Sequence, residues 1–441
     1  MRAVGEAQQR FLESIDALLP GDVRAIIREV GALALETGVR AHVVGGFVRD
    51  MLLGRSNLDV DVVVEGDGIA FAQAAAARLG GRAETHTRFG TAVVRLSPTL
   101  HLDIASARTE HYVRPGALPT VERGSLHDDL LRRDFSINAM AACIDPDSFG
   151  TIADPSGGLS DLRCGVIRAL HPLSFVDDPT RVMRAVRFES RYGFEMEPST
   201  LEWARDASRA GLLGDVSGAR VRSELFALLA EMPALTPLTR LDELGALTVL
   251  LPDGVVTTDA LSHVAASEAS WAGLPTGAGR APQRRVALLA ALAVGGTVDA
   301  VEKWVRRLRL GRVHGGPALQ LAAVHASVAR TLRTKRMLRD SALYALLHPL
   351  ANETVAVVWA LGEPAVRERV ERYLTGLSHV RAAVSGADLL ALGAQPSPVF
   401  SAILDAALAD RLDMRAVGRE AELANLRRLA ARFSIPRKAH T

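Results

Sequence analysis

Two aspartates separated by one residue stand in a valine-rich run, Leu58-Asp59-Val60-Asp61-Val62-Val63-Val64. The run predicts a β-strand, and side chains two residues apart on a strand point to the same face. Two neighbouring carboxylates are costly to ionise together unless a cation neutralises them. Mg²⁺ fits best, because it prefers oxygen ligands from one or two carboxylates together with substrate phosphates. The alternative is a strand edge that exposes two incidental acids to water.

A third acid stands in a second predicted strand, Leu100-His101-Leu102-Asp103-Ile104-Ala105. Asp103 is out of phase with the apolar residues on either side and therefore shares a face with His101. If the two strands are neighbours, Asp103 reaches the same cations as Asp59 and Asp61; otherwise this polar face points to water. Metal pairs held by carboxylates serve in-line displacement at phosphorus, which is the chemistry that this pattern favours.

A glycine pair follows an apolar run in His42-Val43-Val44-Gly45-Gly46-Phe47-Val48-Arg49-Asp50. The pattern predicts a strand, a tight turn and the start of a helix. Glycine lets backbone N–H groups approach a phosphate closely, and a helix N-terminus favours anions. Arg49 would add a fixed positive charge, so the turn is a candidate site for a triphosphate. The segment lacks the Gly-Lys-Ser/Thr of a P-loop, and the alternative is an ordinary strand–helix turn with Arg49 in water.

Four arginines, Arg181, Arg184, Arg187 and Arg191, follow Asp178 at helical spacing and form one stripe of a predicted helix. Beside a metal–triphosphate site such a stripe would contact phosphate and base, whereas by itself it is usually a solvated face. Asp178 and Arg181 could also select a base. A carboxylate accepts from the exocyclic amine of cytosine or adenine, and a guanidinium donates to the adjacent ring nitrogen. Asp178 is otherwise the cap of the helix.

The elements that must position these residues change character along the chain. Residues 8–37 predict two helices broken at Pro20-Gly21 and ended by Gly38. Strand and helix patterns then alternate to about Asp161, which predicts a mixed α/β domain. The strands are expected over 41–44, 58–64, 91–96 and 100–105, and the helices over 47–53 and 69–79. After Asp178 the pattern predicts helices alone, with an exposed loop over 274–282 and a last helical unit over 386–432.

Composition bounds the class of protein. The 441 residues are 48% hydrophobic and 23% charged, which is ordinary for a globular chain. No apolar run reaches the roughly 18–20 residues of a membrane-spanning helix, no signal-peptide pattern begins the chain, and Cys143 and Cys164 cannot form a disulfide framework. A cytoplasmic protein with no membrane partner is therefore expected. The 52 Lys and Arg against 50 Asp and Glu do not by themselves indicate nucleic acid, so clustering of the basic residues decides.

Four motifs, in this order, resemble the class II tRNA nucleotidyltransferases (CCA-adding enzymes) and the related bacterial poly(A) polymerases. They are Gly45-Gly46-Phe47-Val48-Arg49-Asp50 with Asp59-Val60-Asp61, then Leu131-Arg132-Arg133-Asp134-Phe135-Ser136-Ile137-Asn138, then Asp177-Asp178-Pro179-Thr180-Arg181-Val182-Met183-Arg184-Ala185-Val186-Arg187-Phe188, and Arg220-Val221-Arg222-Ser223-Glu224-Leu225. The C-terminal half is similar more loosely, in Gly386-Ala387-Asp388-Leu389 and Pro396-Ser397-Pro398-Val399-Phe400.

The resemblance implies an α/β polymerase-β-like palm followed by an all-helical neck, body and tail. The expected boundaries are N-terminal helices over 1–38, the catalytic palm over 39–161, the neck with the base-selecting helix over 162–235, the body over 236–380 and a tRNA-binding tail over 381–441. Mg²⁺ is implied on Asp59 and Asp61, and Asp103 completes the predicted catalytic set. Nucleotide contacts are expected from Gly45, Gly46, Arg49, Arg133, Asp178, Arg181, Arg184 and Arg187. The expected reaction is template-independent addition of nucleotides from CTP and ATP to the 3′ end of tRNA.

Three alternatives stay open. An enzyme that adds only the terminal A would share every motif, and Pro115-Gly116-Ala117-Leu118-Pro119 and Asp177-Asp178-Pro179-Thr180 look like that branch. A poly(A) polymerase is the second, although such chains usually carry a strongly basic C-terminus. An inactive RNA-binding protein is the third, and the intact Asp59 and Asp61 argue against it. Asp177 stands where the family usually has Glu, a departure that bears on base selection, and the oligomeric state is left open.

The polar segment Arg108–Arg123, hinged at Pro115-Gly116, predicts an irregular loop rather than a core element. Asp61 and Arg133 are 72 positions apart, about the spacing in full CCA-adding relatives, whereas enzymes that add only CC have a shorter segment here. Such a loop can act as a lever that admits ATP. Addition of the terminal A is therefore predicted, and the alternative is a passive surface loop.

Overall fold

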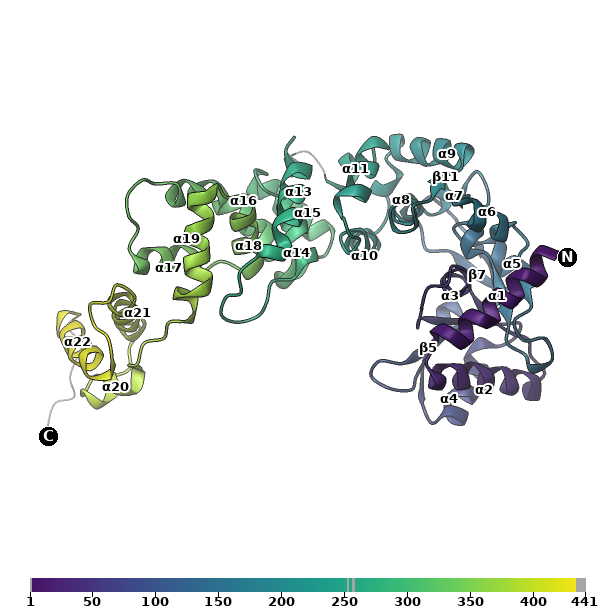
Figure 1. Cartoon of the computed structure of the whole chain (residues 1–441), viewed down its shortest axis with the longest axis horizontal. Coiled ribbons are helices and arrows are strands. Elements are labelled where there is room, and N and C mark those ends of the chain that lie inside the picture. Colours follow the sequence, from purple (N-terminus) through teal and green to yellow (C-terminus); the bar gives the residue numbers. More distant parts are fainter. Residues whose placement is uncertain (1, 252–253, 256–257, 434–441) are drawn as a thin grey trace. The chain divides into compact units, whose positions relative to one another are not determined.

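The computed structural model describes residues 2–251, 254–255 and 258–433. It divides into two compact units, coloured along the chain in Figure 1. Unit 1 holds the chain up to Glu231 together with Thr239–Leu250, and unit 2 holds Met232–Leu238 together with the chain from Leu251.

Unit 1 is built on a mixed seven-stranded sheet with the strand order β3-β4-β5-β2-β1-β8-β9. Strands β2 and β5 are parallel, and the other neighbours are antiparallel. The mixed α/β fold predicted from the sequence is thereby confirmed. The strands are β1 (Ala41–Val44), β2 (Val60–Val64), β3 (Arg82–His86), β4 (Thr91–Arg95), β5 (His101–Ser106), β8 (Ala141–Cys143) and β9 (Ile152–Ala153).

Alternation along β4 and β5 gives this part of the sheet one covered face and one more open face. In β4 and β5 every second residue is buried, among them Val94, Leu102 and Ile104. Helix α4 (Gly68–Leu79) packs against β2, β3, β4 and β5 and covers this apolar face. The half-buried residues between them, including Asp103, lie on the opposite face. The period-2 pattern therefore presents the predicted catalytic acid on the open face.

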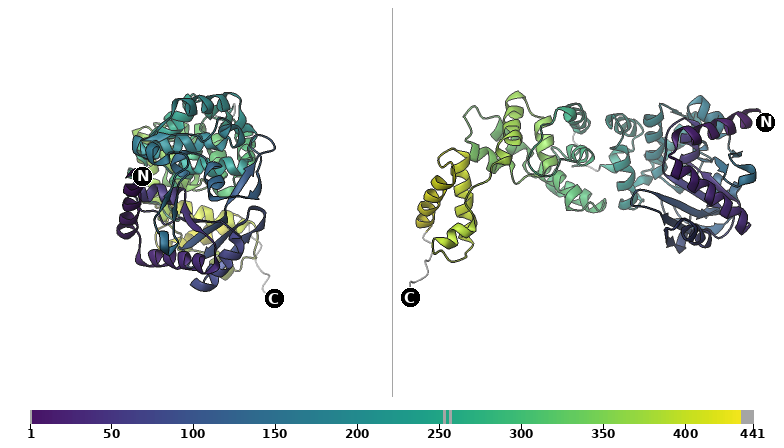
Figure 2. Two further views of the ribbon diagram at one scale, coloured as in Figure 1. Left: turned by 90° about the vertical axis from the view of Figure 1, so that its right-hand side faces the viewer. Right: turned by 60° about the horizontal axis from the view of Figure 1, so that its bottom comes forward.

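The helices of unit 1 pack beside the sheet and follow it along the chain (Figure 2). Pro20 and Gly38 bound α2 as predicted, with Gly38 in the left-handed conformation that ends the helix. The helices are α1 (Arg2–Leu18), α2 (Gly21–Thr37), α3 (Gly46–Leu52), α4, α5 (Leu126–Leu131), α6 (Gly158–Cys164), α7 (Ser174–Asp177), α8 (Thr180–Tyr192), α9 (Pro198–Arg209), α10 (Gly218–Leu228), α11 (Leu235–Glu243), which straddles the unit boundary, and α12 (Leu247–Leu250).

Two segments differ from the sequence-based expectation. The segment 108–123 is a loop only in its middle, because β6 (Arg108–His111) and β7 (Thr120–Arg123) pair as an antiparallel ribbon. Its side chains are polar on both faces, so the apolar alternation that marks a strand is missing. The chain after Asp178 is also not wholly helical, because β11 (Glu195–Met196) pairs in parallel with β10 (Val166–Ile167).

Unit 2 contains helices and their connections. The predicted loop over 274–282 lies between η5 (Trp271–Gly273) and α14. The helices are α13 (Ala260–Ser270), α14 (Arg284–Ala291), α15 (Val298–Arg307), α16 (Arg312–Leu332), α17 (Asp340–Leu347), α18 (Asn352–Ala360), α19 (Pro364–Thr375), α20 (Gly386–Ala391), α21 (Val399–Leu412) and α22 (Arg419–Arg432). Among the described residues, no helix has both the length and the apolar character needed to cross a bilayer.

Candidate active site

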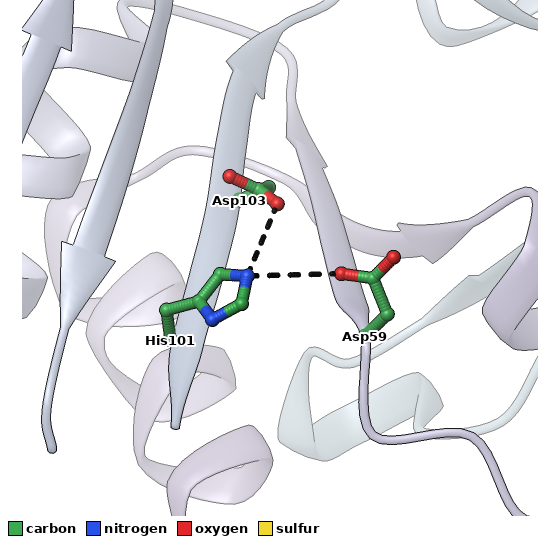
Figure 3. A group of neighbouring side chains, drawn as sticks. All are labelled: Asp59, His101 and Asp103. Atoms are coloured by element: carbon green, nitrogen blue, oxygen red, sulfur yellow. Dashed lines mark ion pairs between the residues drawn. The ribbon is translucent and has the colours of Figure 1, made fainter. Parts of the chain in front are cut away.

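Three acids meet where β2 and β5 run side by side. Asp61 and Asp103 are direct register partners of these parallel strands. Asp59 and Asp103 converge on His101, whose Nε2 lies 3.8 Å from Asp59 Oδ1 and 3.7 Å from Asp103 Oδ2 (Figure 3). The neighbouring strands thus bring Asp103 to the predicted pair, an outcome that the sequence had left open.

Strand β2 begins at Val60, later than expected, so Asp59 lies just outside it. The Asp59 N–H donates to Asn57 Oδ1 at 2.9 Å and not to a neighbouring strand. The Asp59 side chain is 67% exposed, whereas Asp61 is half-buried. The two carboxylates therefore meet different environments instead of standing equally on one strand face.

The charge of the cluster is poorly compensated. Burial and the nearby Asp59 raise the pKa of Asp61 to about 6, against a smaller opposing effect of Arg133. Burial also raises the pKa of Asp103. Carboxylates that resist ionisation in this way fit a divalent cation, and their hard oxygens suit Mg²⁺.

The raised pKa of Asp61 predicts how stability depends on pH. A carboxyl whose folded pKa exceeds its unfolded value destabilises the fold progressively as pH rises through the range from about 4 to about 6. Without divalent cations, Asp61→Asn is therefore expected to melt about 2–4 °C above the parent at neutral pH. The gain should shrink towards pH 4. Thermal melts of both proteins in chelator, with and without added Mg²⁺, measure this; a gain that does not depend on pH would contradict it.

A large cavity of about 700 Å³ opens beside the acids. All eight residues predicted to contact the nucleotide line it, together with Asp59 and Asp61. The eight are Gly45, Gly46, Arg49, Arg133, Asp178, Arg181, Arg184 and Arg187. Their roles stay predictions, but the fold gathers residues from four separate segments at one place.

The glycine turn lies in the cavity wall. Gly45 has φ +68°, which favours glycine, and a Cβ there would stand 2.6 Å from Arg133 Nη1. Arg49 is buried, which excludes the alternative of an arginine in water. Its guanidinium donates to Asp50 Oδ1 at 2.9 Å and to Asn138 Oδ1 at 2.6 Å. Arg49 is thus a fixed part of the wall, not a solvated cation.

The arginine stripe of α8 is partly buried, and three of its members form ion pairs. The alternative that the stripe is simply a solvated helix face is therefore excluded. Arg184 pairs with Asp134 at 2.6 Å; burial opposes ionisation of Asp134, yet the guanidinium holds the pKa of that acid at about 2. Arg187 lies 3.5 Å from Glu224. Its buried Nε has no hydrogen-bond partner within the described chain.

Asp178 and Arg181 are both held by neighbours. Asp178 Oδ1 accepts from Thr180 N–H at 3.0 Å and from the Thr180 hydroxyl at 2.6 Å, and it lies 2.6 Å from Arg220 Nη2. Arg181 donates to Ser174 Oγ at 2.6 Å and to the Arg132 carbonyl at 2.9 Å. Helix α8 begins at Thr180 with Pro179 at its N-cap, so Asp178 stands one residue before the cap and accepts from the Thr180 N–H.

A second cavity, of about 310 Å³, lies over β5 and β4. Asp61 and Asp103 lie in its lining, and the register continues from Asp103 to Val93 on β4. Three residues, Asp61, Arg132 and Arg133, line both cavities. The other polar side chains in the lining of the second cavity are His86, Thr91, Arg108, Arg132 and Arg133.

Comparisons with known proteins identify the family. A model described as the poly A polymerase head domain matches residues 41–168, and one described as a probable RNA and SrmB-binding site of polymerase A matches residues 193–255. The chain is 37% identical over 425 residues to an A-adding tRNA nucleotidyltransferase of Geobacter sulfurreducens, covering 93% of this chain but 48% of that protein. It is 33% identical over 397 residues to the A-adding tRNA nucleotidyltransferase of Halalkalibacterium halodurans, covering 89% and 90% of the two chains.

The chain belongs to the class II tRNA nucleotidyltransferase and poly(A) polymerase family. The fold agrees, because the Thermotoga maritima CCA-adding enzyme, solved in complex with tRNA, superposes with a TM-score of 0.76. That structure is 29% identical and covers 96% of this chain and 98% of its own. The chain spans about half the length of the Geobacter relative but nearly all of the other two.

The relatives within this family change which of the predicted activities is preferred. Both curated relatives described above are A-adding enzymes, and the similarity runs over most of this chain. The comparisons therefore favour the alternative of terminal-A addition over the main prediction of CTP and ATP addition.

The large cavity of this class II nucleotidyltransferase is also lined by residues that were not predicted as site residues. Among them are Glu110, Tyr112, Arg132, Asp134 and Asn138. The last three stand in the motif around Arg133, where the spacing alone could have drawn attention to them. Glu110 and Tyr112 lie in the polar ribbon segment, and no sequence pattern indicates that this segment reaches the cavity.

Proposed function

We propose that the protein adds the terminal A to the 3′ end of tRNA in the cytoplasm, using ATP. The observation that carries this proposal is the arginine-lined cavity that meets the acids at Asp61, in a chain similar to A-adding enzymes over most of its length. The 3′ oxygen of the RNA forms a bond to the α-phosphorus and loses its proton. The bond between the α-phosphorus and the bridging oxygen of the leaving pyrophosphate breaks.

Two cavities that share Asp61 support this reaction, because displacement at phosphorus must bring two substrates to one set of acids. The large cavity, with its arginines, suits the triphosphate. The second cavity, with Thr91 and Val93 beside Asp103, is then the place for the terminal ribose and base of the RNA. Asp61 borders both cavities and stands where the two substrates would meet.

Asp59, Asp61 and Asp103 would hold Mg²⁺, which supplies positive charge for the phosphate oxygens and makes the attacking hydroxyl more acidic. Arg184 and Arg187 add positive charge to the lining of the same cavity. Their ion pairs with Asp134 and Glu224 hold the two side chains in place before the triphosphate binds. The two arginines would therefore lose less conformational entropy on binding.

Asp178 and Arg181 are the proposed base selectors. The three contacts of Asp178 all fall on Oδ1, which leaves Oδ2 as the atom that would accept from the exocyclic amine of adenine. Arg181, held through its two terminal nitrogens, would donate to the adjacent ring nitrogen. Guanine and uracil present the reverse arrangement of donor and acceptor, so each would leave buried polar groups unpaired.

The test supplies CTP and ATP, separately and together, to tRNAs that lack the whole CCA end, lack CA, or lack only the terminal A. A single A added to the tRNA that ends in CC, with no incorporation from CTP, is the expected result. Incorporation from CTP would show a full CCA-adding enzyme, the activity named for the Thermotoga structure. Long runs of A would show a poly(A) polymerase, and no incorporation at all would contradict an enzymatic role.

The ribbon is linked to the base selectors through one backbone hydrogen bond and the side chain of Arg220. The Gly116 N–H donates to the Asp177 carbonyl at 3.3 Å, and Arg220 donates to the Gly116 carbonyl at 3.1 Å. The same Arg220 pairs with Asp178. The tip of the ribbon therefore helps to hold Asp178, the acid that would bind the base. A movement of the segment 108–123 could reach Asp178 through these contacts.

Replacing Tyr112–Pro119 by Asn-Gly, a turn that closes an antiparallel pair, is expected to reduce A addition on the order of 10²-fold, because Arg220 loses one of its anchors and Asp178 shifts. Single-turnover addition to tRNA ending in CC measures this, and tRNA affinity should stay unchanged. Val113→Ser is the matched control, because Val113 is 86% exposed in the same tip. A variant that adds A at the parent rate would show that the tip is a passive loop.

A further inference from the structure

A basic segment of unit 2, residues 330–339, comprises the last residues of α16 and the loop that joins it to α17, and is called the basic loop (Figure 1). Between residues 330 and 339 the chain carries five basic residues and no acid. All five side chains are exposed: Arg330, Arg333, Lys335, Arg336 and Arg339. The chain as a whole carries 52 basic and 50 acidic residues, so this loop is a local concentration of charge that the totals hide.

Most of this charge is uncompensated. Arg333 lies 3.3 Å from Glu363. The first acid after the loop, Asp340, is neutralised by Arg372 at 2.8 Å. Within the described ranges, no carboxylate lies within 4.0 Å of the side-chain nitrogens of the other four basic residues. Four positive charges therefore face solvent in one short segment.

The backbone of the loop is held in shape by one side chain from α19. Arg369 Nη1 donates to the Leu332 carbonyl at 2.5 Å. Its Nη2 donates to the carbonyls of Thr334 at 2.8 Å and Arg336 at 3.2 Å. One guanidinium thus turns three carbonyls towards α19, and Met337 at the tip remains 92% exposed. The backbone of the basic loop is thus held by hydrogen bonds, while its basic side chains remain exposed.

We propose that residues 330–339 bind the phosphate backbone of a double-helical stem of the tRNA. This rests on the proposed function, which makes tRNA the substrate. Guanidinium and ammonium groups pair with phosphates, and proteins recognise an RNA duplex mainly through its phosphates and 2′-hydroxyls. The loop lies outside residues 193–255, which match the RNA-binding model, so it is a separate contact surface. It contributes affinity without reading sequence.

The test compares two double variants that remove one lysine and one arginine each. Lys335→Ala/Arg336→Ala removes uncompensated charge. Lys303→Ala/Arg306→Ala removes the same charge from exposed residues of α15 that already pair with Asp299 and Glu302. The probe is tRNA ending in CC, bound without ATP between roughly 50 and 200 mM salt. The loop variant is expected to bind about tenfold more weakly, with a log–log salt slope shallower by about 1.5–2. The α15 variant should keep the parent slope.

Equal affinities and salt slopes of the two variants would overturn the proposal. It would also be overturned if the loop substitutions spared tRNA but removed binding to vesicles containing phosphatidylglycerol, because the loop would then serve an anionic membrane. This test can be distinguished from the test of the proposed function. If the parent protein binds tRNA through this loop but adds no A, the proposed function is wrong and the proposed tRNA-binding surface is still supported.

Discussion

Asp61→Asn is expected to reduce nucleotide addition at least about 10³-fold at saturating Mg²⁺, while tRNA binding survives. Asp61 borders both cavities, and its ionised oxygens are the atoms that would hold the cation between the two substrates. Asn keeps the shape of the side chain but removes the negative charge. Addition to tRNA ending in CC under single-turnover conditions measures the loss, and filter binding measures tRNA affinity.

Misfolding does not account for this loss, because the same variant is expected to be more stable than the parent at neutral pH without metal. Asp59→Asn should lose activity in the same way. Asp206→Asn is the matched control, since Asp206 is an exposed acid on α9 that lies 3.7 Å from Arg209. Near-parent turnover of either active-site variant would contradict the assignment of the carboxylates.

Asp178→Ala is expected to loosen base choice more than it slows ATP incorporation. A site built to hydrogen-bond a base can reject the wrong one by up to about 10⁴–10⁵. Removing the acceptor should lower the preference for ATP over GTP by on the order of 10²-fold. Incorporation from ATP, CTP, GTP and UTP, each measured alone on tRNA ending in CC, gives the ratios.

Two further variants separate base selection from support of the helix. Thr180→Ala removes the Thr180 hydroxyl that donates to Asp178 and should leave the preference near that of the parent. Arg181→Ala removes the proposed donor to the ring nitrogen and should resemble Asp178→Ala. If the rate falls in all three while the base preference holds, Asp178 and Arg181 serve only to cap the helix or to hold phosphate.

Local sequence determined the scaffold and part of the lining of the large cavity. Alternation in β4 and β5 fixed which residues face the open side, because successive side chains of a strand point to opposite faces. The turn at Gly45 was also predictable, because its backbone conformation strongly favours glycine. The spacing of Arg181, Arg184 and Arg187 placed them on one helix face, and all three line the cavity.

Tertiary structure decided what depends on segments distant in the chain. Asp103 joins the other acids only because β5 pairs with β2, and strand order follows from packing, not from the local pattern. Glu110 reaches the cavity because the polar ribbon folds against Arg132, at 2.7 Å. The basic loop of unit 2 acquires its shape from Arg369, over thirty positions later in the chain. These contacts join groups far apart in sequence, and local periodicity carries no information about them.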